Sequence, residues 1–168
     1  MMSNESTPDF FSTQSRYIEN FYRHGFLFQL MQHLLAQKPP RFLTILNSEV
    51  DNSGIDLVLT LGDITRHIQL KAAVSKRPHT YNVSENLFTI PGGCVVWLIH
   101  DHMKLEIQHY YFLGKSGNQA IGLSADFRAG TKKKNGEKIA RSGYVGVRMS
   151  DANAKAVGIA ELANLLFD

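Results

Sequence analysis

The chain has 168 residues, of which 43% are hydrophobic and 20% charged, as expected for a globular protein large enough to bury a core. Its net charge of +3 at pH 7 is too small to indicate nucleic-acid binding by itself. The single cysteine, Cys94, excludes an internal disulfide, and the sequence has no signal-peptide pattern and no membrane-length apolar run, so we expect a cytoplasmic protein. We expect one domain over residues 1–168, with residues 1–12 as a loose N-terminal lead-in.

The first predicted element is a long helix between Thr13 and Gln37. Apolar residues recur there at helical spacing, His24-Gly25 is a point where the helix can be interrupted, and Pro39-Pro40 stops it. The apolar positions are Tyr17, Phe21, Phe28, Met31 and Leu35, and Ile18, Leu27, Leu30 and Leu34 widen the stripe.

A β-hairpin is the next predicted feature, after a first strand at Arg41–Asn47 and a polar loop at Ser48–Ser53. Its strands are Ile55–Leu61 and Ile64–Ala72, and the Gly62-Asp63 pair between them suits a two-residue turn.

The register of this hairpin predicts where its polar side chains lie. If Leu61 lies opposite Ile64, Asp56 faces Gln69 across the ladder, and Lys71 points to the same side of the sheet. One face then carries a carboxylate, a carboxamide and an ammonium group. The other face is apolar and carries Leu57, Leu59 and Leu61 with Ile68, Leu70 and Ala72.

The remaining elements complete one mixed sheet. They are a short helix near Val83–Phe88 and strands at Cys94–His100, Ile107–Leu113 and Tyr144–Met149. Residues 114–143 are rich in Gly and Lys and are expected to be mostly irregular. Asp151 can cap a closing helix whose buried side includes Val157, Ile159, Leu162, Leu165 and Leu166.

Basic residues are concentrated between residues 128 and 141. This window has a net charge of +5 against +3 for the whole chain, so the rest of the chain is at −2. Such a segment can neutralise backbone phosphates, and the alternative is a solvated surface loop. The basic residues are Arg128, Lys132, Lys133, Lys134, Lys138 and Arg141.

The polar groups of the hairpin form a candidate site for a hard divalent cation. Mg²⁺ prefers oxygen ligands, which Asp56, the amide of Gln69 and the backbone carbonyl of Leu70 can supply. Lys71 would lie beside the metal-bound water, where an ammonium group orients the nucleophile and offsets charge on a phosphoryl group. The alternative is that these side chains are only the solvated face of the hairpin.

The stretch VDNSGIDLVL, followed by IQLKA, resembles the core motif of the PD-(D/E)XK nuclease superfamily. The Gln before the Lys is similar to the Mrr-like branch, whose motif reads roughly D-x-G-I-D followed by Q-x-K. The resemblance covers about Val50 to Ala72 and elsewhere extends only to the order of elements. It implies an α/β (mixed α+β) fold with a restriction-endonuclease-like core, in which helices flank a central mixed β-sheet.

The resemblance also implies roles for individual residues. Asp56 takes the place of the first catalytic acid, Gln69 that of the second acidic position, and Lys71 that of the lysine. The family often adds a glutamate from the first helix, and Glu19 is the candidate for this auxiliary metal ligand. Two departures are that Ile55 stands where the family name expects Pro, and that Gln69 removes one negative charge from the cation site.

These features together predict a metal-dependent nuclease. Water activated by Mg²⁺ or Mn²⁺ would attack a DNA phosphodiester with assistance from Lys71, while RNA stays open as a substrate. Lys76, Arg77 and the basic segment would contact the nucleic-acid backbone, and the resemblance implies a homodimer. The alternative is a catalytically inactive module of the same fold that binds nucleic acid or a protein partner, which the neutral Gln69 favours.

Overall fold

The computed structural model describes residues 14–47, 54–74, 79–101, 103–156 and 158–168, so the predicted lead-in lies outside the described residues. Within these ranges no helix is long and apolar enough to cross a membrane. The predicted mixed α/β class is confirmed. The elements in chain order are α2 (Ser15–Leu35), β1 (Thr44–Asn47), β2 (Leu57–Leu61), β3 (Ile64–Ala73), β4 (Thr80–Ser84), α3 (Glu85–Thr89), β5 (Gly93–Asp101), β6 (Glu106–Leu113), β7 (Arg128–Lys134), β8 (Glu137–Arg148), a 3₁₀ turn (Met149–Asp151), β9 (Ala154–Ala156) and α4 (Ile159–Phe167).

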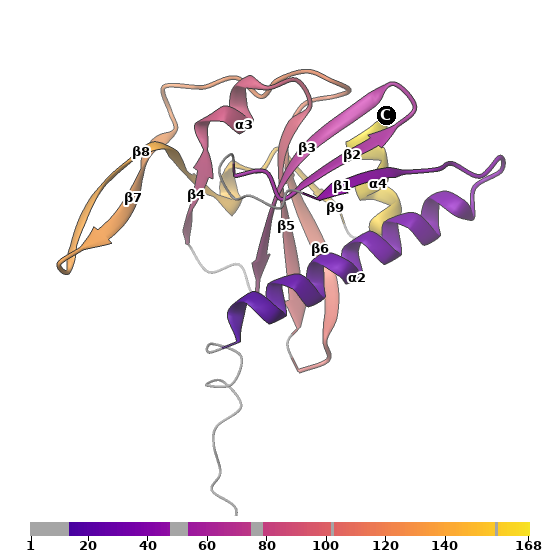
Figure 1. Cartoon of the computed structure of the whole chain (residues 1–168), viewed down its shortest axis with the longest axis horizontal. Helices are drawn as coiled ribbons and strands as arrows, with labels where there is room; N and C mark the ends of the chain where they lie inside the picture. The colour runs from indigo at the N-terminus through magenta and orange to yellow at the C-terminus, as the bar shows by residue number, and fades with distance from the viewer. Residues whose placement is uncertain (1–13, 48–53, 75–78, 102, 157) are drawn as a thin grey trace, which may run out of the picture.

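The central sheet is mixed and has six strands in the order β1-β2-β3-β5-β6-β9 (Figure 1). Strands β3 and β5 are parallel, and the other neighbouring pairs are antiparallel. The α3 helix lies in the crossover between β3 and β5, as a parallel connection requires. The predicted central strand is therefore confirmed as β5, with β6 beside it.

Both faces of the central sheet are covered, which explains why β5 reads as one continuous apolar run. Cys94, Val96 and Leu98 pack into a cluster with residues of α2 and α4. The alternate residues Val95 and Trp97 pack on the other side with α3, β4 and β8. The sheet is thus the middle layer of the molecule.

The prediction of a single sheet is wrong, because β4, β8 and β7 form a separate three-stranded antiparallel sheet. The segment expected to be irregular contains β7 and the first half of β8, which are joined at Asn135-Gly136. Both turn residues have positive φ, 51° and 84°, as a tight hairpin turn requires. The strands carry little apolar alternation because nearly every side chain of β7 is exposed, so only the Asn-Gly pair signals the hairpin.

The long helix is continuous through His24-Gly25, and its buried side differs from the main predicted stripe. The five positions at the centre of that prediction are all exposed: Tyr17 69%, Phe21 42%, Phe28 63%, Met31 37% and Leu35 50%. The helix instead buries Tyr22 and Phe26 together with Leu27, Leu30 and Leu34, which were predicted to widen the stripe. Apolar residues thus occupy two faces of α2, and periodicity alone does not show which face meets the sheet.

The C-terminal region also differs from the prediction. Asp151 does not cap the closing helix; its Oδ2 accepts a hydrogen bond from the backbone N–H of Arg148 at 2.7 Å across the 3₁₀ turn. The chain then adds the short edge strand β9 before α4 begins after Gly158. Leu162 and Leu166 are buried as expected, while Val157 lies outside the described residues.

Candidate active site

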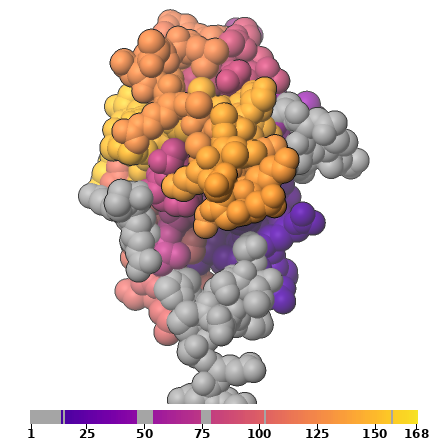
Figure 2. Space-filling model, turned by 90° about the vertical axis from the view of Figure 1, so that its left-hand side faces the viewer, coloured from indigo at the N-terminus to yellow at the C-terminus, as the bar shows by residue number. Residues whose placement is uncertain are grey.

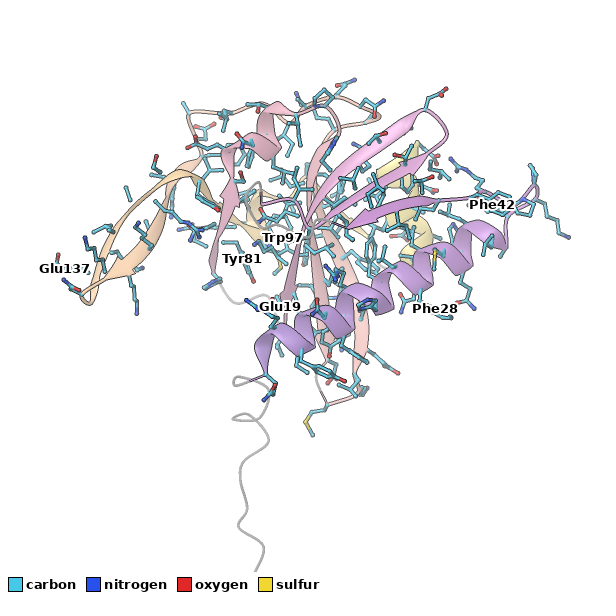
Figure 3. All side chains as sticks on the ribbon, in the orientation of Figure 1. Glu19, Phe28, Phe42, Tyr81, Trp97 and Glu137 are labelled. Carbon is cyan, nitrogen blue, oxygen red and sulfur yellow. The ribbon has the colours of Figure 1, made fainter. Side chains whose placement is uncertain are left out.

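The side chains predicted to form the site line one cleft of about 410 Å³. They are Glu19 from α2, Asp56 from the residue before β2, and Gln69, Leu70 and Lys71 from β3. The remaining walls come from β4, β5 and β8, including Tyr81, Leu98 and Tyr144. In Figure 3, Glu19 and Tyr81 lie on the side of the molecule from which the β7–β8 hairpin projects. A larger open hollow of about 700 Å³ between β6, β9 and α4 contains none of the predicted catalytic residues.

The cleft exists because the two strands of the hairpin have unequal lengths. Their register is the predicted one, with Leu61 opposite Ile64, and the ladder ends at Leu57 opposite Ile68. Strand β3 continues beyond that pair to Ala73, and among the described strands it pairs there only with β5. No described strand pairs with the other edge of β3 from Gln69 onward, which leaves that edge available to side chains.

Asp56 binds to this edge of β3 through its backbone and its side chain, and not as a paired residue of the predicted ladder. Its backbone N–H donates to the carbonyl of Ile68 at 2.8 Å, and its side-chain Oδ2 accepts from the backbone N–H of Leu70 at 2.6 Å. The strand pairing thus stops one residue before the expected Asp56–Gln69 pair. The carboxylate occupies the place of the next ladder acceptor, which fixes it beside β3.

Gly54 permits the close approach of chain segments behind the cleft. Its φ of +66° lies in the left-handed region, and a Cβ there would lie 2.7 Å from the Cβ of Ser84 and 3.4 Å from Nε2 of Gln69. A side chain would be strained and would collide with the end of β4. Glycine before Asp56 is therefore required by packing.

Gln69 supplies the observation that tests whether a cation fits. The residue is 6% exposed, and its buried Oε1 has no hydrogen-bond partner among the described residues. A buried polar atom without a partner requires an explanation such as an ion. The cleft also holds the carboxylates of Asp56 and Glu19, so the oxygen donors present fit Mg²⁺ or Mn²⁺. No cluster of three His, Cys, Asp or Glu side chains is found in the described part of the chain.

Three basic side chains, Arg23, Lys71 and Arg141, line the same cleft. Arg23 was not predicted, and its Nε is buried without a hydrogen-bond partner among the described residues. It lies four residues after Glu19 on α2, so the i, i+4 spacing in a continuous helix was the signal that could have found it. The lining thus combines oxygen donors for a cation with guanidinium and ammonium groups suited to a phosphate.

Two aromatic side chains, Tyr81 and Tyr144, also line the cleft. The guanidinium carbon of Arg141 lies 3.6 Å from the centre of the Tyr144 ring, which is cation–π contact. Tyr81 packs edge-on against Trp97, with ring centres 6.1 Å apart. Burial raises the pKa of the Tyr81 phenol above its ordinary value, so this side chain stays protonated at neutral pH and can donate a hydrogen bond.

The residues predicted to contact nucleic acid lie at different places in the structure. Arg141 lines the cleft, whereas four lysines lie further out on the exposed β7–β8 hairpin. Lys76 and Arg77 lie outside the described residues. The four lysines are Lys132, Lys133, Lys134 and Lys138.

Comparison with known proteins adds no relative. No family model, no curated protein and no solved structure matches the chain.

Proposed function

We propose that this protein is a metal-dependent nuclease with a restriction-endonuclease-like fold that hydrolyses DNA phosphodiester bonds. The observation that carries the proposal is that Asp56, Glu19, Lys71 and Gln69 line one cleft and that the buried Oε1 of Gln69 has no partner among the described residues. The order of α2, β1, the β2–β3 hairpin, α3 and β5 also agrees with the order of elements expected for that fold, with β4 inserted before α3.

The residues of the cleft divide into two chemical groups. Asp56, Gln69 and Glu19 would hold Mg²⁺ or Mn²⁺ through oxygen atoms, with the carbonyl of Leu70 as a further donor. When bound, this cation supplies Lewis-acid polarisation of the phosphate and a more acidic water. Lys71 orients the attacking water and offsets the negative charge that develops on the phosphoryl oxygens.

Arg23 and Arg141 would bind the phosphodiester from two walls of the cleft. A guanidinium group donates paired hydrogen bonds to phosphate oxygens and keeps its charge at all working pH values. Arg23 belongs to α2 and Arg141 to β8, so a phosphate between them would be held in place relative to the carboxylates. This positioning favours in-line attack.

The second candidate is a catalytically inactive module that binds nucleic acid or a protein partner. The neutral amide at position 69 favours it, since one fewer negative charge weakens cation binding. Such a module would keep the basic surface but would not hydrolyse nucleic acid.

The decisive experiment is cleavage of plasmid, single-stranded DNA and RNA in Mg²⁺ or Mn²⁺ by the purified chain and three variants. Asp56→Ala and Lys71→Ala are expected to lose cleavage, whereas Lys104→Ala, at an exposed turn, is expected to retain it. Equal cleavage by all four proteins would reject the assignment. Salt-sensitive binding without any cleavage would select the inactive module.

We also propose that the chain forms a homodimer through α2. The exposed residues Tyr17, Phe21, Phe28, Met31 and Leu35, together with the exposed His24, follow a 4-3-4-3-4 spacing, which is the seam of a helix–helix pair. No Asp, Glu, Lys or Arg occurs at these six seam positions, nor at the flanking positions 18, 20, 25 and 32. A second copy of this helix can therefore cover the seam without burying a charge.

A further inference from the structure

The β7–β8 hairpin continues beyond the body of the molecule as a basic arm, which we define as residues 128–141. It projects to one side in Figure 1, and Figure 2 looks onto that side, where the orange arm stands toward the viewer. Glu137 marks its tip in Figure 3. Its paired residues are Thr131 with Ala140, Lys132 with Ile139, Lys133 with Lys138, and Lys134 with Glu137.

The base of the arm is fixed to the wall of the cleft. The side chain of Asn82 donates to the carbonyl of Thr131 at 2.8 Å and accepts from its N–H at 2.9 Å. Asn82 itself lines the cleft, as do Arg141 and Tyr144 at the other strand of the base. These contacts set the direction in which the arm leaves the cleft.

The strand geometry sorts the arm lysines onto two faces. Cross-strand partners share a face and neighbours along a strand alternate, so Lys132 and Lys134 share a face with Glu137, Ile139 and Arg141. We name this the cleft face, because Arg141 lines the cleft. The outer face carries Lys133 and Lys138, which lie directly opposite each other.

Gly143, two residues after the arm, bends strand β8 where the arm joins the cleft. Its φ is +76°, and a Cβ at this position would meet no heavy atom within 4 Å, so the residue serves as a backbone kink and not as a close-packing site. Arg141 and Tyr144 are three residues apart, an odd spacing that would place them on opposite faces of a regular strand. The kink brings both into the cleft, where they stack.

We propose that the cleft face of the arm binds the sugar-phosphate backbone of a nucleic-acid strand as it leaves the cleft, and that the outer face does not. The proposal rests on the proposed function and adds the path of the substrate. From Arg141 to the tip is four residues, or about 14 Å at ~3.4 Å per residue. That length corresponds to about four nucleotides of one strand at ~3.4 Å each along the duplex axis. Lys132 and Lys134 lie along this path.

The test compares two double variants with the same change in charge. Lys132→Ala/Lys134→Ala removes two charges from the cleft face, and Lys133→Ala/Lys138→Ala removes two from the outer face. Binding of labelled duplex and single-stranded DNA is measured by fluorescence anisotropy over a salt series, in a Lys71→Ala background so that the DNA stays intact. The cleft-face variant is expected to lower the slope of log affinity against log salt by about 1.8 for duplex and about 1.4 for single strands, since each of the two lost phosphate contacts removes ~0.9 or ~0.7.

The outer-face variant is expected to keep the slope of the parent. An equal reduction in both variants would show an undirected basic surface and overturn the proposal, as would no reduction in either. If the two variants differ in slope but the wild-type chain cleaves no substrate, the proposal for the arm stands and the nuclease assignment is rejected. Absence of DNA binding by every protein would reject both. Thermal unfolding of each variant checks the fold, which these exposed side chains are not expected to affect.

Discussion

At the scale of single residues, Gln69 decides whether the cleft binds a cation. We predict that Gln69→Glu lowers the melting temperature in EDTA, because the new carboxylate is buried in the same cleft as Asp56. Added Mg²⁺ should raise that melting temperature more than it does for the wild type and should lower the Mg²⁺ concentration needed for cleavage.

Differential scanning fluorimetry with and without Mg²⁺ measures the effect apart from activity. Gln108→Glu on the exposed side of β6 is the matched control and should show no Mg²⁺ response. A Gln69→Glu protein whose melting temperature ignores Mg²⁺ would contradict the cation site.

Under the proposed function, Arg23 is suited to bind the substrate phosphate, because it lines the cleft and its buried Nε has no partner among the described residues. We predict that Arg23→Gln lowers kcat/KM for DNA by roughly 10- to 100-fold, since a hydrogen bond to a charged group is worth about 1.5–3 kcal/mol. Steady-state cleavage kinetics measure it. Arg16→Gln, an exposed change on the same helix, removes the same charge and should leave kcat/KM near the wild-type value. A loss of the same size in both would mean that only net charge matters.

The residues that could be predicted from the sequence are those in the hairpin motif. Asp56, Gln69 and Lys71 are close along the chain and their register follows from a two-residue turn, so local rules place them together. Arg23 could not be placed in the same way, since its role depends on how α2 crosses the end of β3. Long-range packing decides that crossing.

At the scale of elements, the buried Arg66 connects the hairpin to the last helix. The sequence predicts an apolar face there, yet Arg66 lies on it opposite Leu59 and is 0% exposed. Its Nε donates to the carbonyl of Leu166, its Nη1 to that of Lys115 at 2.7 Å and its Nη2 to that of Leu165 at 3.2 Å. Two of these carbonyls belong to the final turn of α4, which otherwise lacks donors.

We predict that Arg66→Met destabilises the protein by about 3 kcal/mol or more, because three carbonyl groups lose a charged donor in a buried place. Urea unfolding measures the change in free energy. Arg128→Met, at an exposed position on β7, is the control and should change stability by less than about 0.5 kcal/mol. Equal stability of the two variants would contradict a capping role for Arg66.

The elements that could be predicted are the ones with strong apolar patterns. The apolar run of β5 identified the centre of the sheet correctly, and Pro39-Pro40 marked the end of α2 within a few residues. The β7 strand and β9 lack such a pattern, because one is exposed and the other has only three residues. Their pairing partners, not their own composition, make them strands.

At the scale of the whole molecule, the cleft lies where three layers meet. Helix α2 lies on one face of the central sheet, the small sheet lies on the other, and the open edge of β3 joins them. Local sequence rules could find the β3 contribution but not the walls supplied by α2, β4 and β8. Glu19 and Arg141 are each 30 or more positions away along the chain from Asp56, Gln69 and Lys71, so only the folded topology brings them to the site.

The exposed seam of α2 leads to the prediction about assembly. Two antiparallel copies of α2 can pair so that the numbers of facing residues add up to 52. Tyr17 then faces Leu35, Phe21 faces Met31, and His24 faces Phe28, so the aromatic end of one helix packs on the aliphatic end of the other. We predict a dimer in sedimentation equilibrium and a Met31→Lys variant that dissociates at least tenfold more readily, because a lysine is then buried in the seam.

The matched control is Met103→Lys, which places the same charge at a 70% exposed methionine in the turn between β5 and β6. This variant should stay dimeric, since that turn lies outside the seam. A wild-type chain that is monomeric at all concentrations, or equal dissociation of both variants, would reject the α2 interface. If the nuclease assignment also holds, pairing two clefts explains how a chain with one site cuts both strands, so Met31→Lys should nick plasmid more readily than it linearises it.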